Sequence, residues 1–97
     1  MMRVVITSDA ESDLDDIFEY VAADSVPAAF RLVGRLRDKA LRVGNAPRAC
    51  VLRPQYGDGA RCAFYQSYVI VFQIVRSQVE VLHFVHGARD LKRLLGS

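Results

Sequence analysis

Apolar residues in the first part of the chain recur at helical spacing. Leu14, Ile17, Phe18 and Val21 stand at positions i, i+3, i+4 and i+7, which predicts a helix over 9–23 with one apolar stripe. Ser8 precedes this pattern and Glu11 follows three residues later, so the pair predicts a capping box. The opposite side of the helix is acidic, and we expect it to face solvent.

A second helical pattern covers 27–43. Asp24 or Ser25 can cap it, Pro27 suits its first turn and Gly44 ends it. Its apolar stripe consists of Ala29, Val33, Leu36, Ala40 and Val43, widened by Phe30, Leu32 and Leu41. The short break between the two patterns predicts an antiparallel helical hairpin with one shared apolar face.

Strand-like segments flank this hairpin. A β-branched run predicts an opening strand over 3–7, and a connection over 45–59 includes a short strand at 51–52. Three further strands are expected at Arg61–Tyr65, Tyr68–Val75 and 78–85, with two-residue breaks at 66–67 and 76–77 that fit hairpin turns. We therefore predict an α+β fold: an N-terminal strand, an antiparallel helical hairpin and a mainly antiparallel three-stranded meander.

The strand Tyr68–Val75 is apolar at both even and odd positions, so both of its faces need cover. One helical hairpin covers only one face of a sheet. The C-terminal segment, the stems of Arg and Tyr side chains, or another polypeptide must cover the other. A partner protein is the most economical of these explanations.

Composition changes this picture little. The 97 residues make one domain over 1–97, and the apolar content of 52% comes in runs far shorter than a membrane span. No signal peptide is visible, so we expect a cytoplasmic location with no membrane contact. Cys50 and Cys62 are twelve residues apart, a spacing typical of reduced packing residues rather than a metal site, and no cofactor is predicted.

Charge is uneven although the net charge is only +2. Basic residues dominate 31–61 and acidic residues dominate 9–24. Acidic residues at a helix start are favoured by the helix dipole. The modest total charge makes direct nucleic-acid binding unexpected except through a complex.

With this order of elements, the chain resembles the ParE/RelE superfamily of toxins from type II toxin–antitoxin systems, and ParE most closely. The residues that carry the resemblance are Ala10–Leu14 with Ile17 and Tyr20, Gly59–Arg61 followed by Tyr68–Phe72, and Val81–Asp90 with its His-Gly-Ala-Arg-Asp ending. The resemblance implies a helical hairpin packed on a mainly antiparallel sheet. It also implies neutralisation by a ParD-like antitoxin laid in the groove between the hairpin and the sheet.

Two targets follow from the resemblance. ParE-like toxins poison DNA gyrase, whereas RelE-like relatives cut mRNA on the ribosome. RNA cleavage needs a base, a cation and an acid within hydrogen-bond reach. Arg53, Arg61 and Arg89 offer cations, but no Tyr follows Tyr68, and the tail offers no general acid beyond Lys92. His83 and His86 could substitute.

We therefore expect a gyrase inhibitor that is not an enzyme and has no catalytic residues. An mRNA endonuclease is the alternative. A third possibility is a non-toxic protein that binds its antitoxin and serves in autoregulation of the operon.

Candidate site residues fall into two groups. The residues expected to contact a partner or target are Arg61, Tyr65, Tyr68, Arg89, Lys92 and Arg93, and those expected to have structural roles are His86, Gly87 and Asp90. Gly87 is expected to turn the chain at positive φ, and Asp90 to cap a short C-terminal helix over 91–95. Arg89 is expected either to pair with Asp13 or Asp16 or to face a partner.

Overall fold

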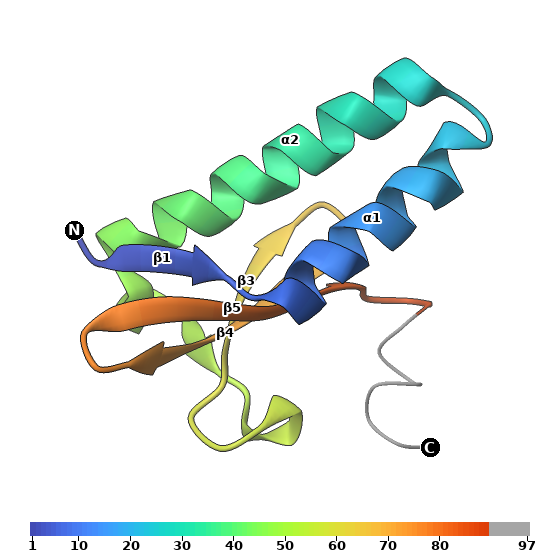
Figure 1. Cartoon of the computed structure of the whole chain (residues 1–97). Coiled ribbons are helices and arrows are strands. Elements are labelled where there is room, and N and C mark those ends of the chain that lie inside the picture. Colours follow the sequence, from blue (N-terminus) through green and yellow to red (C-terminus); the bar gives the residue numbers. More distant parts are fainter. Residues whose placement is uncertain (90–97) are drawn as a thin grey trace.

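The computed structural model describes residues 1–89, in which two helices lie on one face of a five-stranded sheet (Figure 1). The elements are β1 (Arg3–Ile6), α1 (Ser8–Ala22), α2 (Val26–Arg42), β2 (Val51–Leu52), β3 (Arg61–Tyr65), β4 (Tyr68–Val75) and β5 (Gln78–His86). Three 3₁₀ turns, η1 (Val43–Asn45), η2 (Pro47–Ala49) and η3 (Pro54–Tyr56), lie between α2 and β3. The α+β class and the order of elements are confirmed. The predicted helix over 91–95, with Asp90 as its cap, lies outside the described residues.

The sheet has the strand order β1-β5-β4-β3-β2. The strands β3, β4 and β5 form the predicted antiparallel meander, with turns that place Gln66, Arg76 and Ser77 at positive φ. The strand β1 pairs in parallel with β5, a position that the sequence pattern did not predict. The first and last described strands are therefore neighbours.

The helix caps differ partly from prediction. Ser25 caps α2 as expected, but the N-cap of α1 is Thr7 rather than Ser8. The Thr7 hydroxyl accepts the Ala10 N–H at 3.3 Å and donates to the Val81 carbonyl at 2.7 Å, so the cap also joins α1 to β5. Glu11 does not complete a capping box, because its carboxylate binds the Arg37 guanidinium on α2 at 2.7 and 2.8 Å.

The shared apolar face of the hairpin packs on the sheet. Leu14 and Ile17 of α1 and Leu36 of α2 are buried against β4 and β5. Phe30 and Leu41 were expected to widen the buried stripe, yet they are 67% and 41% exposed. Each follows a buried residue of α2, Ala29 or Ala40, by one position, and the tip of the hairpin extends beyond the sheet in Figure 1.

The second face of the sheet is covered by the chain itself. Its buried residues are Ala60, Cys62, Val69, Val71 and Val85, packed with Tyr56 and Leu82. Tyr56 belongs to η3, and this loop lies on the side of the sheet opposite the helices (Figure 1). The prediction that a partner protein covers this face is therefore wrong, because the connection between β2 and β3 folds over it.

Candidate partner-binding surface and the joint after β5

The joint after β5 is fixed by backbone contacts to the turn between β3 and β4. The Gly87 N–H donates to the Ser67 carbonyl at 2.8 Å. Gly87 has no positive φ, contrary to expectation. A Cβ at this position would instead lie 3.3 Å from the Ser67 oxygen, so close approach of two backbone segments favours glycine here.

His86 is part of the same joint. Its ring packs edge-on against Tyr68, with 5.2 Å between the ring centroids, and its Nδ1 accepts the Arg89 N–H at 3.2 Å. Tyr68 is only 7% exposed and belongs to the core beneath the helices. The partner contact expected of Tyr68 is therefore wrong, because its side chain is buried in the core. The contacts of His86 are of the structural kind expected of this residue.

Arg89 contacts an aromatic ring rather than a carboxylate. Its guanidinium lies 4.0 Å from the centroid of the Tyr20 ring on α1. A cation–π contact at an exposed site contributes about 0.5–1 kcal/mol. The predicted ion pair with Asp13 or Asp16 is not formed in the described structure, and Arg89 together with the 64% exposed Tyr20 is open to solvent.

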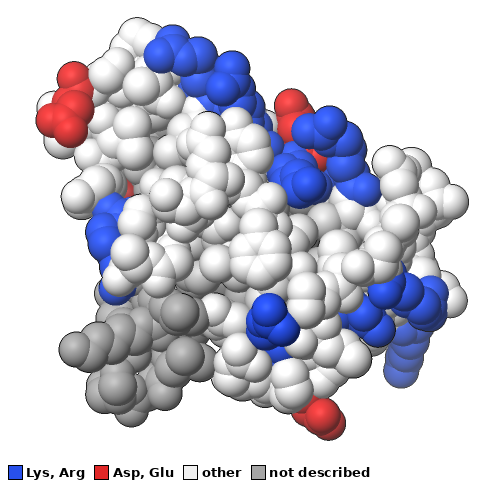
Figure 2. All heavy atoms as spheres, turned by 180° about the vertical axis from the view of Figure 1, so that it is seen from behind, with Lys and Arg blue, Asp and Glu red and all other residues white. Residues whose placement is uncertain are grey.

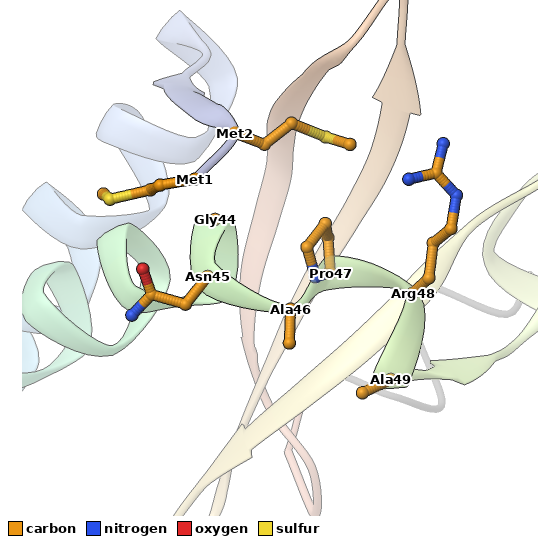
Figure 3. Close-up of a pocket in the computed structure, with 8 residues that line it drawn as sticks. All are labelled: Met1, Met2, Gly44, Asn45, Ala46, Pro47, Arg48 and Ala49. Atoms are coloured by element: carbon orange, nitrogen blue, oxygen red, sulfur yellow. The ribbon is translucent and has the colours of Figure 1, made fainter.

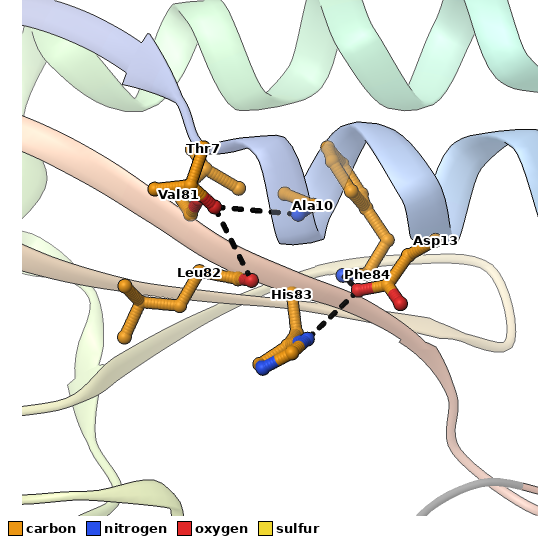
Figure 4. A network of polar contacts seen from close by, with 7 residues as sticks. All are labelled: Thr7, Ala10, Asp13, Val81, Leu82, His83 and Phe84. Atoms are coloured by element: carbon orange, nitrogen blue, oxygen red, sulfur yellow. Dashed lines mark hydrogen bonds and ion pairs between the residues drawn. The ribbon is translucent and has the colours of Figure 1, made fainter.

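Asp13 has other partners (Figure 4). Its Oδ2 accepts the Phe84 N–H at 3.1 Å and lies 2.9 Å from Nδ1 of His83. Figure 4 also shows Thr7 reaching from the start of α1 to the neighbouring backbone of β5. His83 therefore helps to hold α1 on β5, and its Nδ1 is occupied by this contact.

Arg61 is used within the fold. Its Nη1 donates to the carbonyls of Cys50 at 2.8 Å and Arg48 at 3.2 Å. These bonds join the chain before β2 to the first residue of β3. Tyr65, at the other end of β3, is half-buried, and its hydroxyl accepts from the Gln66 side chain at 3.4 Å.

The predicted contact residues thus do not form one cluster. Arg61 and Tyr65 lie at opposite ends of β3, whereas Arg89 lies against α1. Lys92 and Arg93 lie outside the described residues. Partner contact by these residues stays a prediction.

The surface has apolar residues that sequence reasoning placed in the core or passed over. The large apolar side chains that are most exposed within 1–89 are Met1, Tyr20, Val26, Phe30, Leu41, Val51, Leu52 and Phe64. In Figure 2, Lys and Arg side chains surround a broad uncharged area on one face of the molecule. An uncharged surface with a basic margin suits an acidic partner better than a small substrate.

One hollow opens near the N-terminus (Figure 3). It has a volume of about 360 Å³ and is lined by Met1, Met2 and residues 44–49. Asn45 and Arg48 supply its only ionic or amide side chains, so this lining offers no acid–base pair.

The two thiols are packing groups. Cys50 is half-buried and Cys62 is buried, and both are free. Burial raises the pKa of each thiol, which keeps them protonated at neutral pH and disfavours nucleophilic chemistry. Among residues 1–89, no group of three His, Cys, Asp or Glu side chains is placed to hold a metal ion.

Comparison with known proteins decides the family. The sequence profile described as the ParE toxin of type II toxin-antitoxin system, parDE, matches residues 4–91. The chain belongs to the ParE toxin family. The expected resemblance to ParE is thereby confirmed, and the chain is a toxin of the type II toxin–antitoxin class.

Solved structures agree with this family. A chain described as "Chromosomal ParDE TA system from P. aeruginosa" matches with a TM-score of 0.77 at 20% identity, over 89% of this chain and 96% of that one. At this identity the match shows a shared fold. No curated protein matches the sequence significantly. Within 1–89, neither helix of this ParE-family chain is both long and apolar enough to cross a membrane.

Proposed function

We propose that this ParE-family toxin acts in the cytoplasm by binding DNA gyrase, that it is not an enzyme, and that a cognate ParD-like antitoxin neutralises it by direct contact. One observation carries the choice of gyrase over mRNA cleavage. Both histidines and one of the three candidate arginines, Arg61, are engaged in holding the fold, whereas Arg89 is exposed over Tyr20. His83 contacts Asp13, His86 packs on Tyr68, and Arg61 binds backbone carbonyls.

Separation of these groups supports the same choice. General acid–base catalysis requires the base, the cation and the acid to converge on one phosphate. Here His83 lies on β5 and contacts Asp13 of α1, whereas Arg61 lies on β3 and pairs with Leu52 of β2. Binding to a protein target needs no such convergence.

Antitoxin binding is supported by the exposed apolar residues on α2. Phe30 and Leu41 lie on α2 and are more than a third exposed, whereas the half-exposed Phe64 of β3 pairs with Val69 on the face opposite the helices and does not line this groove. The exposed arginines Arg31, Arg35 and Arg42 recur on α2 at a spacing that places them along one side. We propose that the antitoxin lays apolar side chains in the groove between the hairpin and the sheet and directs carboxylates toward these arginines.

The test is induction of the chain without its antitoxin, followed by two assays on the same cells. Gyrase supercoiling activity and trapped gyrase–DNA cleavage complexes are measured beside primer extension on a translated mRNA. We expect loss of supercoiling and accumulation of cleavage complexes, both reversed when the small protein encoded beside this chain is co-expressed.

Two results would contradict the proposal. Codon-phased mRNA ends with normal gyrase activity would indicate a ribosome-dependent endonuclease. Unchanged growth with stable binding to the neighbouring protein would indicate a chain that serves only in operon autoregulation.

A further inference from the structure

The exposed side of α2 carries a row of arginines. Arg31, Arg35 and Arg42 are all exposed. At 3.6 residues per turn they lie within about 40° of one another around the helix axis, and at 1.5 Å per residue the row is about 16 Å long. In Figure 2, Lys and Arg side chains follow one another along the upper margin of the molecule, where α2 runs. The helix thus presents a basic row to solvent.

The fold does not engage these three side chains. Within residues 1–89 they form no hydrogen bond, ion pair or ring contact, whereas the neighbouring Arg37 binds Glu11. Like charges four residues apart, as at Arg31 and Arg35, destabilise a helix. The row therefore lowers the stability of the isolated chain, and an anionic partner would offset this cost.

Gly34 lies on the same side of α2, three residues after Arg31 and one before Arg35. Glycine inside a helix is less stable than alanine, because its backbone loses more conformational freedom on folding. Nothing in the described fold requires glycine here, since the residue is exposed and a Cβ would meet no other part of the fold within 4 Å. A helix surface without a side chain allows the backbone of a partner to approach closely. The glycine and the unpaired arginines therefore point to one binding face.

The chemistry of this face suits a phosphate backbone. Guanidinium groups bind phosphates through two parallel hydrogen bonds. A row of about 16 Å spans several phosphates of one DNA strand, which are about 3.4 Å apart along the duplex axis. The bases of a single strand instead need exposed aromatic rings on which to stack. The one aromatic residue of α2 is Phe30, and its ring already contacts Phe18 edge-on, with 4.8 Å between the centroids.

We propose that the face of α2 formed by Arg31, Gly34, Arg35 and Arg42 binds the phosphate backbone of duplex DNA. The choice of DNA rests on the proposed action on gyrase, which holds a DNA duplex. The net charge of +2 makes the contact weak for the chain alone, and gyrase would offset this by keeping DNA beside the toxin at high local concentration. Carboxylates of the antitoxin, which we also expect at these arginines, would compete with the phosphates.

Asp38 lies on the same side and distinguishes phosphate from a protein partner. It is exposed, three residues after Arg35 and four before Arg42, and forms no ion pair within residues 1–89. A carboxylate repels phosphate but attracts a cationic side chain. Asp38→Asn should therefore lower the Kd for duplex DNA at least about twofold. Asp58→Asn, the same change in charge on the connection between β2 and β3, is the control and should have a smaller effect.

Fluorescence anisotropy of the full chain with a short labelled DNA duplex, at about 50 mM salt and above, measures the contact. We expect Arg35→Ala to raise the Kd at least about fivefold and to reduce the slope of log K against log salt by about one, because one phosphate contact is lost. Arg76→Ala, on the exposed turn between β4 and β5, removes the same charge and should change the Kd less than about twofold.

Gly34→Ala tests the close approach separately. The fold leaves room for the added methyl group and alanine favours the helix, so the Tm should stay or rise. The Kd for the duplex should nevertheless rise at least about threefold, since the methyl group holds the phosphates away from the neighbouring arginines. An unchanged Kd would overturn the close approach of a DNA backbone at this face.

Failure of this inference can be told from failure of the gyrase proposal. Absence of duplex binding at low salt, equal losses for Arg35→Ala and Arg76→Ala, or weaker binding by Asp38→Asn overturns the DNA contact, whatever the gyrase assay shows. Tighter binding of an RNA duplex of the same length overturns the choice of DNA. Duplex binding that depends on Arg35 and Gly34, in a chain that leaves gyrase activity unchanged, supports the contact and overturns the gyrase target.

Discussion

At the scale of single residues, Asp13 explains how α1 is held on the sheet. One carboxylate oxygen contacts both the Phe84 N–H and the His83 ring across 70 and 71 positions of sequence. Hydrogen bonds to a charged acceptor are stronger than neutral ones, and removal of the acceptor leaves a buried donor unpaired. The residue thus contributes to stability rather than to a surface for partners.

Replacement of Asp13 by alanine should lower the free energy of unfolding by about 1–3 kcal/mol, since the Phe84 N–H loses its acceptor. Urea denaturation followed by circular dichroism measures this loss. Asp16→Ala, on the exposed side of the same helix, is the matched control and should change stability by no more than about 0.5 kcal/mol. Equal losses of stability in the two variants would show that Asp13 stabilises the protein only through its negative charge on α1.

The ion pair between Glu11 and Arg37 predicts a dependence of stability on pH. The hydrogen bond from Arg37 lowers the pKa of Glu11 below its ordinary value of 4.5, against a smaller opposing effect of burial. A carboxyl whose pKa is lower in the folded state contributes stability above the unfolded pKa, and this contribution is lost as pH falls through the folded value.

We therefore expect Glu11→Gln to be less stable than the natural chain at pH 7, with the difference disappearing as pH falls below about 4.5. Because both side chains are about 40% exposed, solvent screening limits the difference to less than about 1 kcal/mol. Urea midpoints at several pH values measure it. A difference that stays constant from pH 7 to 3 would contradict the ion pair as its cause.

At the scale of elements, sequence periodicity located both helices and all the strands of the meander. It placed the α1 cap one residue late, because Ser8 and Glu11 satisfy the local rule for a capping box. The structure prefers Thr7, whose hydroxyl meets both Ala10 and the distant Val81 carbonyl. The Glu11 carboxylate instead binds Arg37 on α2. A local sequence pattern cannot predict this contact between two helices.

This cap can be tested with two neighbouring variants. Thr7→Ala should cost about 1–2 kcal/mol of stability, because α1 loses its cap and β5 loses a contact to the helix. Ser8→Ala, at the first helical residue, should change stability by no more than about 0.5 kcal/mol. Thermal unfolding of the two variants distinguishes them, and the reverse order of effects would favour the cap inferred from sequence.

At the scale of the whole molecule, both faces of β4 are buried without a partner. The helices cover Ile70 and Phe72 on one face, and the η3 connection covers Val71 on the other. The apolar pattern of β4 correctly predicted two covered faces. It did not show that a loop rich in Pro and Gly would cover the second face. Loops lack the regular spacing of apolar residues by which helices and strands are recognised.

Val71→Ala should therefore destabilise the chain without any partner present. Loss of two buried carbons is expected to cost about 2 kcal/mol, including the cavity that remains. Val51→Ala, at a site 40% exposed on β2, is the control and should cost less than about 1 kcal/mol. A stability loss at Val71 that appears only in the antitoxin complex would contradict burial by η3.

The candidate site was less predictable than the fold. The place of His86 and Gly87 after an apolar strand suggested structural roles, but the positive φ expected of Gly87 was wrong, because close approach to the Ser67 carbonyl favours glycine there. The exposure of Phe30 and Phe64 could not be inferred from the sequence. Hydrophobic periodicity indicates which residues share one face of a helix or strand, but it does not show how far the neighbouring layer of the fold extends over that face. Arg61 was chosen for its charge, and only tertiary structure shows that its guanidinium binds the carbonyls of Cys50 and Arg48.

The parallel pairing of β1 with β5 has a consequence for synthesis. β5 lies between β1 and β4 in the sheet, and it is the last described strand to be translated. Until it emerges from the ribosome, β1 has no neighbour in the sheet and Asp13 has neither of its β5 contacts. Native contacts between distant parts of a chain form late and slowly. The nascent chain thus cannot reach its folded form before β5 has left the ribosome, so no toxin fold exists while only β1, the helices and the strands up to β4 have been made.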